Sequence, residues 1–171
     1  MKVPRVLLAA ALVVGGTMTA ALPAQADDST YTAHLSAANE VPTNASLARG
    51  QAIFMLSADG TTIEYRLIVA NLENPIAAHI HIAPEGVNGP VVAFLYGPTV
   101  PGGARTSGVI ATGTITAADL VGPLAGLSLS DLVAAMDAGD AYVNVHTNDG
   151  DPSTTGGPGD LPGGEIRGQI D

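Results

Sequence analysis

The sequence predicts an all-β protein, a β-sandwich of about eight strands with one short helix near residues 128–138. Two observations support this fold class: short segments that alternate apolar and polar residues recur along the chain, and turn-forming residues separate them. A third observation limits how the fold is stabilised. The 171-residue chain contains no cysteine, so a buried core must hold it together without disulfides, and the chain is long enough to form one.

The predicted strands lie at short intervals. Most show the alternation of a strand whose successive side chains face opposite sides of a sheet, whereas residues 91–96 are a continuous apolar run and residues 109–115 are rich in Thr and β-branched residues. Turn signals such as Asp59-Gly60 and Asn88-Gly89-Pro90 lie between them. In chain order the predicted strands span residues 31–37, 51–56, 63–69, 78–82, 91–96, 109–115, 142–146 and 165–170.

One segment has helical periodicity instead. Ser128 and Asp131 show the pattern of a capping box, and apolar residues recur at helical spacing as far as Met136 before Gly139 ends the pattern. Met136 belongs to the apolar stripe of this helix, so we expect it to face the core and not to bind a metal. Residues 147–164 are rich in Gly, Pro, Asp and Thr and predict a long exposed loop.

The first residues predict a removable signal peptide. Lys2 and Arg5 supply positive charge, residues 6–14 are apolar, and Ala24-Gln25-Ala26 places small residues at the positions that precede cleavage after Ala26. An uncleaved membrane anchor is the alternative, but the apolar run falls short of the roughly 18 residues that a span requires. We therefore expect a secreted or extracytoplasmic protein with no transmembrane segment after cleavage. The sequence leaves open whether the protein is released or stays associated with the cell wall.

The predicted organisation is a signal peptide at 1–26, a short flexible tail at 27–30 and a single domain at 31–171. Composition narrows the functions of this domain. With six basic and sixteen acidic residues the chain has a formal net charge of -10, which argues against a nucleic-acid partner. The lack of cysteine excludes zinc fingers, iron–sulfur clusters, thiolate copper sites and cysteine nucleophiles, so a transition-metal site must use His, carboxylate or Met.

The triplet His79-Ile80-His81 is the most informative motif. Residues two apart in a strand share a face, so both imidazoles point one way while Ile80 points into the core. Neutral imidazole nitrogens at this spacing can chelate one copper or zinc ion. His146 ends another predicted strand, and if the two strands are neighbours, the three imidazoles converge on one face. The sequence thus indicates a metal site formed by His79, His81 and His146.

A structural interpretation of the same histidines stays open, because polar residues at strand ends often donate hydrogen bonds to loop backbone. His34 lies on the polar side of the first predicted strand; we expect it to be solvated and treat it as a secondary site candidate.

The acidic loop and the last strand supply the other secondary candidates. Asp149 and Asp151 could offer oxygens to calcium together with neighbouring polar residues, but their spacing matches no EF-hand loop. Glu165 and Arg167 alternate outward on the last predicted strand, where we expect an exposed ion pair of small energetic consequence.

Catalytic motifs are not evident in the sequence. It shows no G-x-S-x-G elbow, no Gly-rich phosphate loop opening a helix and no H-E-x-x-H pattern. We therefore predict no catalytic residues and treat the protein as a non-enzymatic one, with enzymatic activity left undecided.

Taken jointly, several segments resemble the CHRD domain, the module first described in chordin. The resemblance implies a stand-alone, exported protein of the type seen in bacteria, with a Greek-key β-sandwich fold. It implies a fold more than a function. The resembling segments are Tyr31 to Leu35 with Glu40 to Pro42, Gly50 to Ala52, Ala78 to His81 with Gly89 to Val92, Tyr142 to Thr147, and Gly163 to Ile170.

A fainter similarity connects the chain with copper-zinc superoxide dismutase, another Greek-key sandwich. That family carries two copper ligands as H-x-H and another histidine near the end of a later strand, the order of His79, His81 and His146 here. Arg167 is loosely comparable with the arginine that guides anions in the dismutase. The bridging histidine, the zinc-site histidines and the disulfide cysteines of that family have no counterparts in this chain.

These observations lead to a ranked set of functions. The leading hypothesis is an exported, non-enzymatic binding protein that holds a copper or zinc ion through clustered histidines. The alternative is an extracellular module that recognises protein or glycan, with structural histidines. A redox enzyme of the dismutase type is the third hypothesis.

Overall fold

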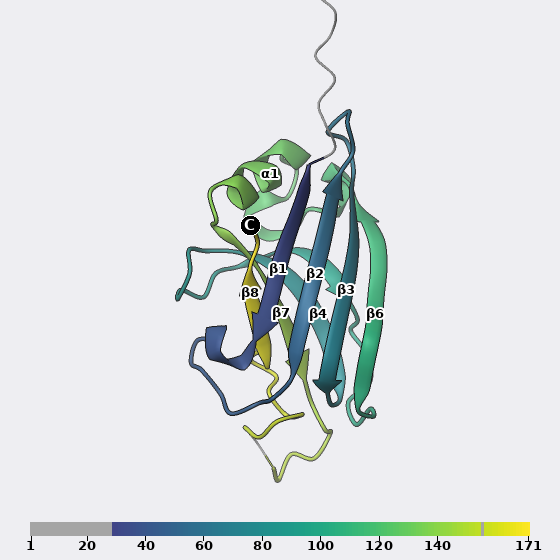
Figure 1. Ribbon diagram of the computed structural model, residues 1–171, viewed down its shortest axis with the longest axis vertical. Helices are drawn as coiled ribbons and strands as arrows, with labels where there is room; N and C mark the ends of the chain where they lie inside the picture. The colour runs from purple at the N-terminus through teal and green to yellow at the C-terminus, as the bar shows by residue number, and fades with distance from the viewer. Residues whose placement is uncertain (1–28, 155) are drawn as a thin grey trace, which may run out of the picture.

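The computed structural model describes residues 29–154 and 156–171 (Figure 1). The predicted signal peptide at 1–26 and the first half of the predicted tail lie outside the described residues. No helix among the described residues is both long and apolar enough to cross a membrane.

The predicted all-β fold is confirmed. The described residues form eight strands, which are β1 (Thr30–Ser36), β2 (Arg49–Leu56), β3 (Ile63–Leu72), β4 (Pro75–Ile82), β5 (Val91–Tyr96), β6 (Thr106–Ile115), β7 (Ala141–Thr147) and β8 (Ile166–Gln169). The helix α1 (Leu129–Asp137) lies where helical periodicity predicts it, and three short 3₁₀ turns complete the secondary structure, at Ala37–Asn39, Ala117–Asp119 and Gly122–Leu124.

All eight strands pair antiparallel in one nearly closed sheet, in the order β5-β4-β7-β8-β1-β2-β3-β6. The sheet folds over so that β1, β2, β3 and β6 face the layer that contains β4 and β7 (Figure 1). The connections from β3 to β4, β5 to β6 and β6 to β7 pass between these layers, as in a Greek-key sandwich. Strands β4 and β7 are neighbours, which the metal hypothesis requires.

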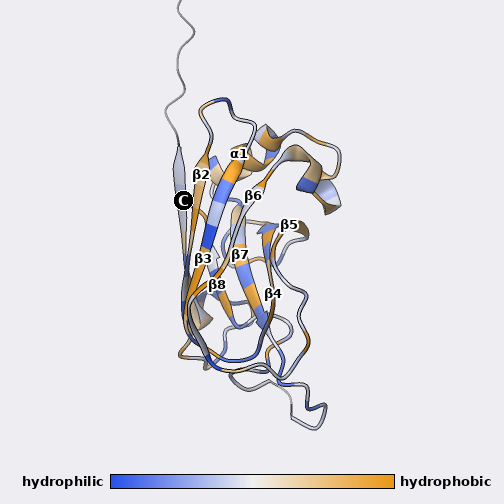
Figure 2. Ribbon diagram, turned by 90° about the vertical axis from the view of Figure 1, so that its right-hand side faces the viewer, coloured by the Kyte–Doolittle hydropathy of each residue, from blue (hydrophilic) through white to orange (hydrophobic). Residues whose placement is uncertain are grey.

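The core between the layers follows from alternation along the strands, which is visible as changing hydropathy along β3 and β7 (Figure 2). Phe54, Leu67, Ile80 and Val143 are among the fully buried residues that fill it. Helix α1 starts at the predicted capping box and closes one end of the core. Met136 on this helix is buried in the core, as predicted.

The outer face of β4, β7 and β8 differs from an ordinary solvated face. Loops cover it, so the outward side chains of these strands form a buried or half-buried polar layer. This polar layer consists of His79, His81, Tyr142, Asn144, His146, Arg167 and Gln169.

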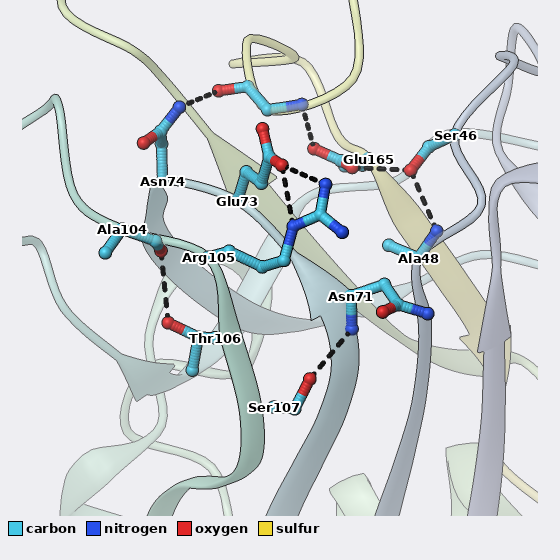
Figure 3. Close-up of polar contacts among 11 residues, drawn as sticks. Ser46, Ala48, Asn71, Glu73, Asn74, Ala104, Arg105, Thr106, Ser107 and Glu165 are labelled. Atoms are coloured by element: carbon cyan, nitrogen blue, oxygen red, sulfur yellow. Dashed lines mark hydrogen bonds and ion pairs between the residues drawn. The ribbon is translucent and has the colours of Figure 1, made fainter.

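The predicted exposed ion pair of Glu165 and Arg167 is wrong, because each side chain is only 1% exposed. Their outward direction is the predicted one, but loops pack over both. The Glu165 carboxylate accepts hydrogen bonds from Ser46 Oγ at 2.5 Å (Figure 3) and from Gly159 N at 2.9 Å. It also accepts one from Thr147 Oγ1 at 2.6 Å, so that it connects three other segments of the chain. The loop at 147–164 is therefore anchored at several points, although most of its side chains are exposed as predicted.

Candidate metal centre

Pairing of β4 with β7 brings the three predicted histidines together. Asn144 lies opposite His79 in the register and His146 lies opposite Ala77, so all three imidazoles project from the same outer face. His79 Nδ1 and His146 Nε2 are 3.1 Å apart, and one nitrogen from each of the three rings lies within 4.8 Å of the others. No other group of three or more His, Asp or Glu side chains within 29–154 and 156–171 comes close enough together to hold a metal ion.

Hydrogen bonds to loop backbone orient two of these rings. His81 Nδ1 lies 2.9 Å from the carbonyl oxygen of Gly89, and His146 Nδ1 lies 2.9 Å from that of Pro162. Since a carbonyl only accepts, both Nδ1 atoms carry the proton and both Nε2 atoms keep a lone pair. His81 Nε2 is buried without a hydrogen-bond partner. Two unprotonated nitrogens are thus presented to the site.

His79 completes the arrangement through Nδ1. In the free protein this atom donates to His146 Nε2 when it carries the proton. Moving that proton to His79 Nε2 leaves a lone pair on one nitrogen of each ring, on His79 Nδ1, His81 Nε2 and His146 Nε2. A single tautomer change therefore converts a hydrogen-bonded cluster into a set of three nitrogen donors.

The surroundings keep the three imidazoles neutral. Burial lowers the pKa of His79 to about 4, helped by the neighbouring His146 and His81 rings. Burial also lowers the pKa of His81 and of His146, and the nearby Arg167 acts in the same direction on His81. Neutral imidazole is the form that binds metal ions.

Aromatic side chains of the same face pack against the cluster. The Tyr142 ring stacks on His81 with a centroid separation of 4.8 Å and an interplanar angle of 11°, and Phe94 meets His79 edge-on at 5.1 Å. The Tyr142 hydroxyl accepts a hydrogen bond from Gly89 N at 3.1 Å. Gly89 thus contacts both members of the stack, because its carbonyl also accepts from His81.

Sequence reasoning missed these supporting residues. Asn88-Gly89-Pro90 predicts only a turn, and Tyr142 is noticeable only as a polar-face neighbour of His146. A Cβ on Gly89 would lie 1.8 Å from the Ile82 carbonyl oxygen, so no other residue fits there without a shift. This requirement depends on packing against β4, which a turn signal does not reveal.

The secondary candidates lie apart from the cluster. His34 is exposed on β1, as expected. Asp149 is half-buried and Asp151 is exposed, and both accept hydrogen bonds inside their own loop, Asp149 from Asp151 N at 2.8 Å and Asp151 from Ser153 N at 2.9 Å. These aspartates therefore stabilise turns and form no calcium-binding group with a third acidic side chain among the described residues. Arg167 packs on Tyr142, next to the metal candidates.

A comparison with models of known protein families gives a match. The family model described as the CHRD domain matches residues 31–170, which is most of the chain and nearly all of the described part. No curated protein and no solved structure matches the chain significantly. An all-β sandwich with this match over its full extent identifies the family: the chain belongs to the CHRD-domain family.

Proposed function

We propose that this CHRD domain is an exported, non-enzymatic binding module that holds one copper or zinc ion through His79 Nδ1, His81 Nε2 and His146 Nε2. The observation that carries the proposal is the buried Nε2 of His81, which has no hydrogen-bond partner. It belongs to a group of three imidazoles of which one nitrogen each lies within 4.8 Å of the others. Buried polar atoms in folded proteins nearly always have a partner, and a bound ion supplies one here.

The geometry fits a first-row ion. Metal–nitrogen bonds of about 2.0–2.1 Å at tetrahedral angles place two ligand nitrogens roughly 3.3 Å apart. The observed separation of His79 Nδ1 and His146 Nε2 is 3.1 Å, close to this requirement. The third imidazole offers a nitrogen within 4.8 Å of the other two, so binding of one ion requires the three nitrogens to move closer together.

The outer hydrogen bonds of the ligands support the same role. Metal-binding histidines usually donate their second ring N–H to a carbonyl or carboxylate, which fixes the tautomer. His81 does so to Gly89 and His146 to Pro162. Export is part of the proposal because residues 1–26 have the three zones of a signal peptide.

Titration of the metal-free protein with Zn²⁺ and with Cu²⁺ at a pH above about 6.5, where imidazoles are neutral, tests the proposal. We expect saturable binding of one ion per chain by calorimetry or Cu²⁺ absorbance. Absence of saturable binding for both ions rejects the proposal.

A module that recognises protein or glycan, with purely structural histidines, is the second candidate. The hydrogen bonds of His81 and His146 to two covering loops favour it, because they fasten those loops to the sheet. This alternative predicts that His79→Ala and His146→Ala lower the thermal stability of the metal-free protein and that metal ions leave the parent protein unchanged. The two candidates therefore differ in the metal response of the parent.

A further inference from the structure

Arg167 is a buried cation that metal binding by three imidazoles does not by itself require. Its side chain is 1% exposed on β8, and its guanidinium donates to Asn88 Oδ1 at 3.2 Å and to the Pro84 carbonyl oxygen at 3.3 Å. Neither acceptor is a carboxylate. Because a guanidinium stays protonated in proteins, this region carries a permanent positive charge.

The Tyr142 ring contacts both the Arg167 guanidinium and the proposed ligand His81. Arg167 Cζ is 3.4 Å from the centre of the Tyr142 ring, and the other face of Tyr142 stacks on His81. The three side chains form a continuous stack that ends at the imidazole. The position of the charge relative to His81 is therefore fixed by packing.

The charge of a bound ion is not balanced by its proposed ligands. All three are neutral imidazoles, and no carboxylate among the described residues belongs to the cluster. A divalent ion therefore adds two positive charges to a largely buried region that already holds a guanidinium, whereas a monovalent ion adds one. Coulomb repulsion and the cost of desolvation both grow with the charge of the ion.

Glu40 supplies only part of a counter-charge. Its side chain is 4% exposed, and its Oε1 accepts a hydrogen bond from Asn144 Nδ2 at 2.7 Å within the polar layer. Burial raises the pKa of Glu40 to about 7 although Arg167 acts against this shift. At neutral pH the carboxylate is therefore only partly ionised, and it offsets the Arg167 charge incompletely.

On the basis of the proposed metal site, we propose that this site binds Cu(I) in preference to Zn²⁺. Arg167 determines this selectivity through its stack with Tyr142 and His81. Cu(I) is the monovalent ion that imidazole nitrogens bind well, and it accepts three donors without a fourth ligand. Arg167 then acts as a selectivity-determining residue that does not touch the ion.

The test compares two affinities in the same protein. Under anaerobic conditions, competition with the chelator bicinchoninate gives the Cu(I) affinity, and competition with a zinc indicator gives the Zn²⁺ affinity. We expect the parent to bind Cu(I) more tightly than Zn²⁺ and the ratio of the two affinities to fall about tenfold in Arg167→Met, as the loss of one nearby charge requires.

Arg105→Met is the matched control. Arg105 forms an exposed ion pair with Glu73, apart from the polar layer, so its replacement removes the same formal charge from the surface (Figure 3). We expect this variant to leave the ratio unchanged within about twofold because solvent screens exposed charges. Glu40→Gln removes the opposing charge and should raise the Cu(I) to Zn²⁺ ratio.

The outcomes separate the two proposals. If the parent binds neither ion, the metal site itself is wrong. If the parent binds both but prefers Zn²⁺, or if Arg167→Met weakens both ions by the same factor, the site stands and the charge selectivity is overturned. If Arg167→Met does not fold, two other variants test the proposal. The ratio of Cu(I) to Zn²⁺ affinity should stay unchanged in Arg167→Lys, which keeps the charge, and should rise in Glu40→Gln.

Discussion

The Nε2 atom of His81 shows how a single residue connects structure with function. His81 lies on β4, its Nδ1 donates a hydrogen bond to the Gly89 carbonyl oxygen, and the Tyr142 ring stacks on its imidazole. These contacts orient the ring. The remaining nitrogen lies in a buried position without a hydrogen-bond partner. Under the metal proposal, the lone pair of this oriented ring is one of the three that bind the ion.

Replacement of His81 by Ala should therefore remove metal binding. We expect the affinity for Zn²⁺ to fall by more than about 100-fold, since one of three donors and the fixed orientation of the set are both lost. Calorimetric titration of the metal-free protein measures this. His34→Ala is the control, because His34 is an exposed histidine apart from the cluster and its loss should leave the affinity unchanged.

Glu40 predicts an unusual pH dependence of stability. Burial raises its pKa from 4.5 to about 7 in the folded protein, so folding favours the protonated form. The contribution of Glu40 to the free energy of unfolding is therefore complete below pH 4.5, decreases as the pH rises and is lost above about pH 7. The change amounts to about 3 kcal/mol at most.

Denaturant unfolding at pH 5 and pH 8, with a chelator present, measures this contribution. The free energy of unfolding of the parent should fall more between these pH values than that of Glu40→Gln, whose side chain cannot ionise but can still accept from Asn144. Equal pH dependence in the two proteins would contradict the prediction.

Residue types and spacing were sufficient to predict that the three histidines could lie together on one face of the sheet. They did not predict the burial of the neighbouring side chains. Alternation gives the direction of Arg167 and Glu165 correctly, because side-chain direction follows from strand periodicity. It does not give their exposure, since the covering loops come from distant parts of the chain. Glu165, for example, is buried by contacts with Ser46 and Gly159.

At the scale of elements, the loop between β4 and β5 is as important as the strands. Its Gly89 joins the loop to Tyr142 through N–H and to His81 through the carbonyl. Arg167 holds the same loop from β8 through Pro84 and Asn88. Three strands, β4, β7 and β8, and the loop between β4 and β5 are therefore joined at the candidate site.

Substitution of Gly89 by Ala should disturb this support. The new Cβ would lie 1.8 Å from the Ile82 carbonyl oxygen, so the loop must move and the hydrogen bond to His81 must weaken. We expect a 10- to 100-fold loss of metal affinity, the usual cost of a lost outer hydrogen bond, with most of the fold retained.

The matched control is Gly157→Ala, because a Cβ at this position meets no atom within 4 Å. Its metal affinity should equal that of the parent. A Gly89→Ala protein with unchanged affinity would show that the loop does not orient His81.

The strands and the helix were predictable because local patterns specify them. The strand segments carry period-2 alternation or β-branched residues, and the capping box marks the start of α1. The pairing of β4 with β7 was only a condition of the metal hypothesis, since the two strands are separated by two strands and a helix along the chain. Strand order depends on long-range packing, which periodicity does not encode.

At the scale of the whole molecule, metal binding should add to the stability of a chain that has no disulfides. An ion at 100 times its dissociation constant raises the free energy of unfolding by about 2.7 kcal/mol when it binds only the folded state. Thermal unfolding with and without Zn²⁺ measures this gain, and His81→Ala should show none. An unchanged melting temperature of the parent at saturating ion would favour purely structural histidines.

The sheet order also affects how the protein behaves at high concentration. The end strands β5 and β6 contact each other across the closing gap, although no hydrogen-bonded ladder joins them. A strand from another molecule would have to enter this gap to extend the sheet. The fold thereby shields its unpaired backbone groups against edge-to-edge association, a hazard that open sheets must counter with charged or proline-containing borders.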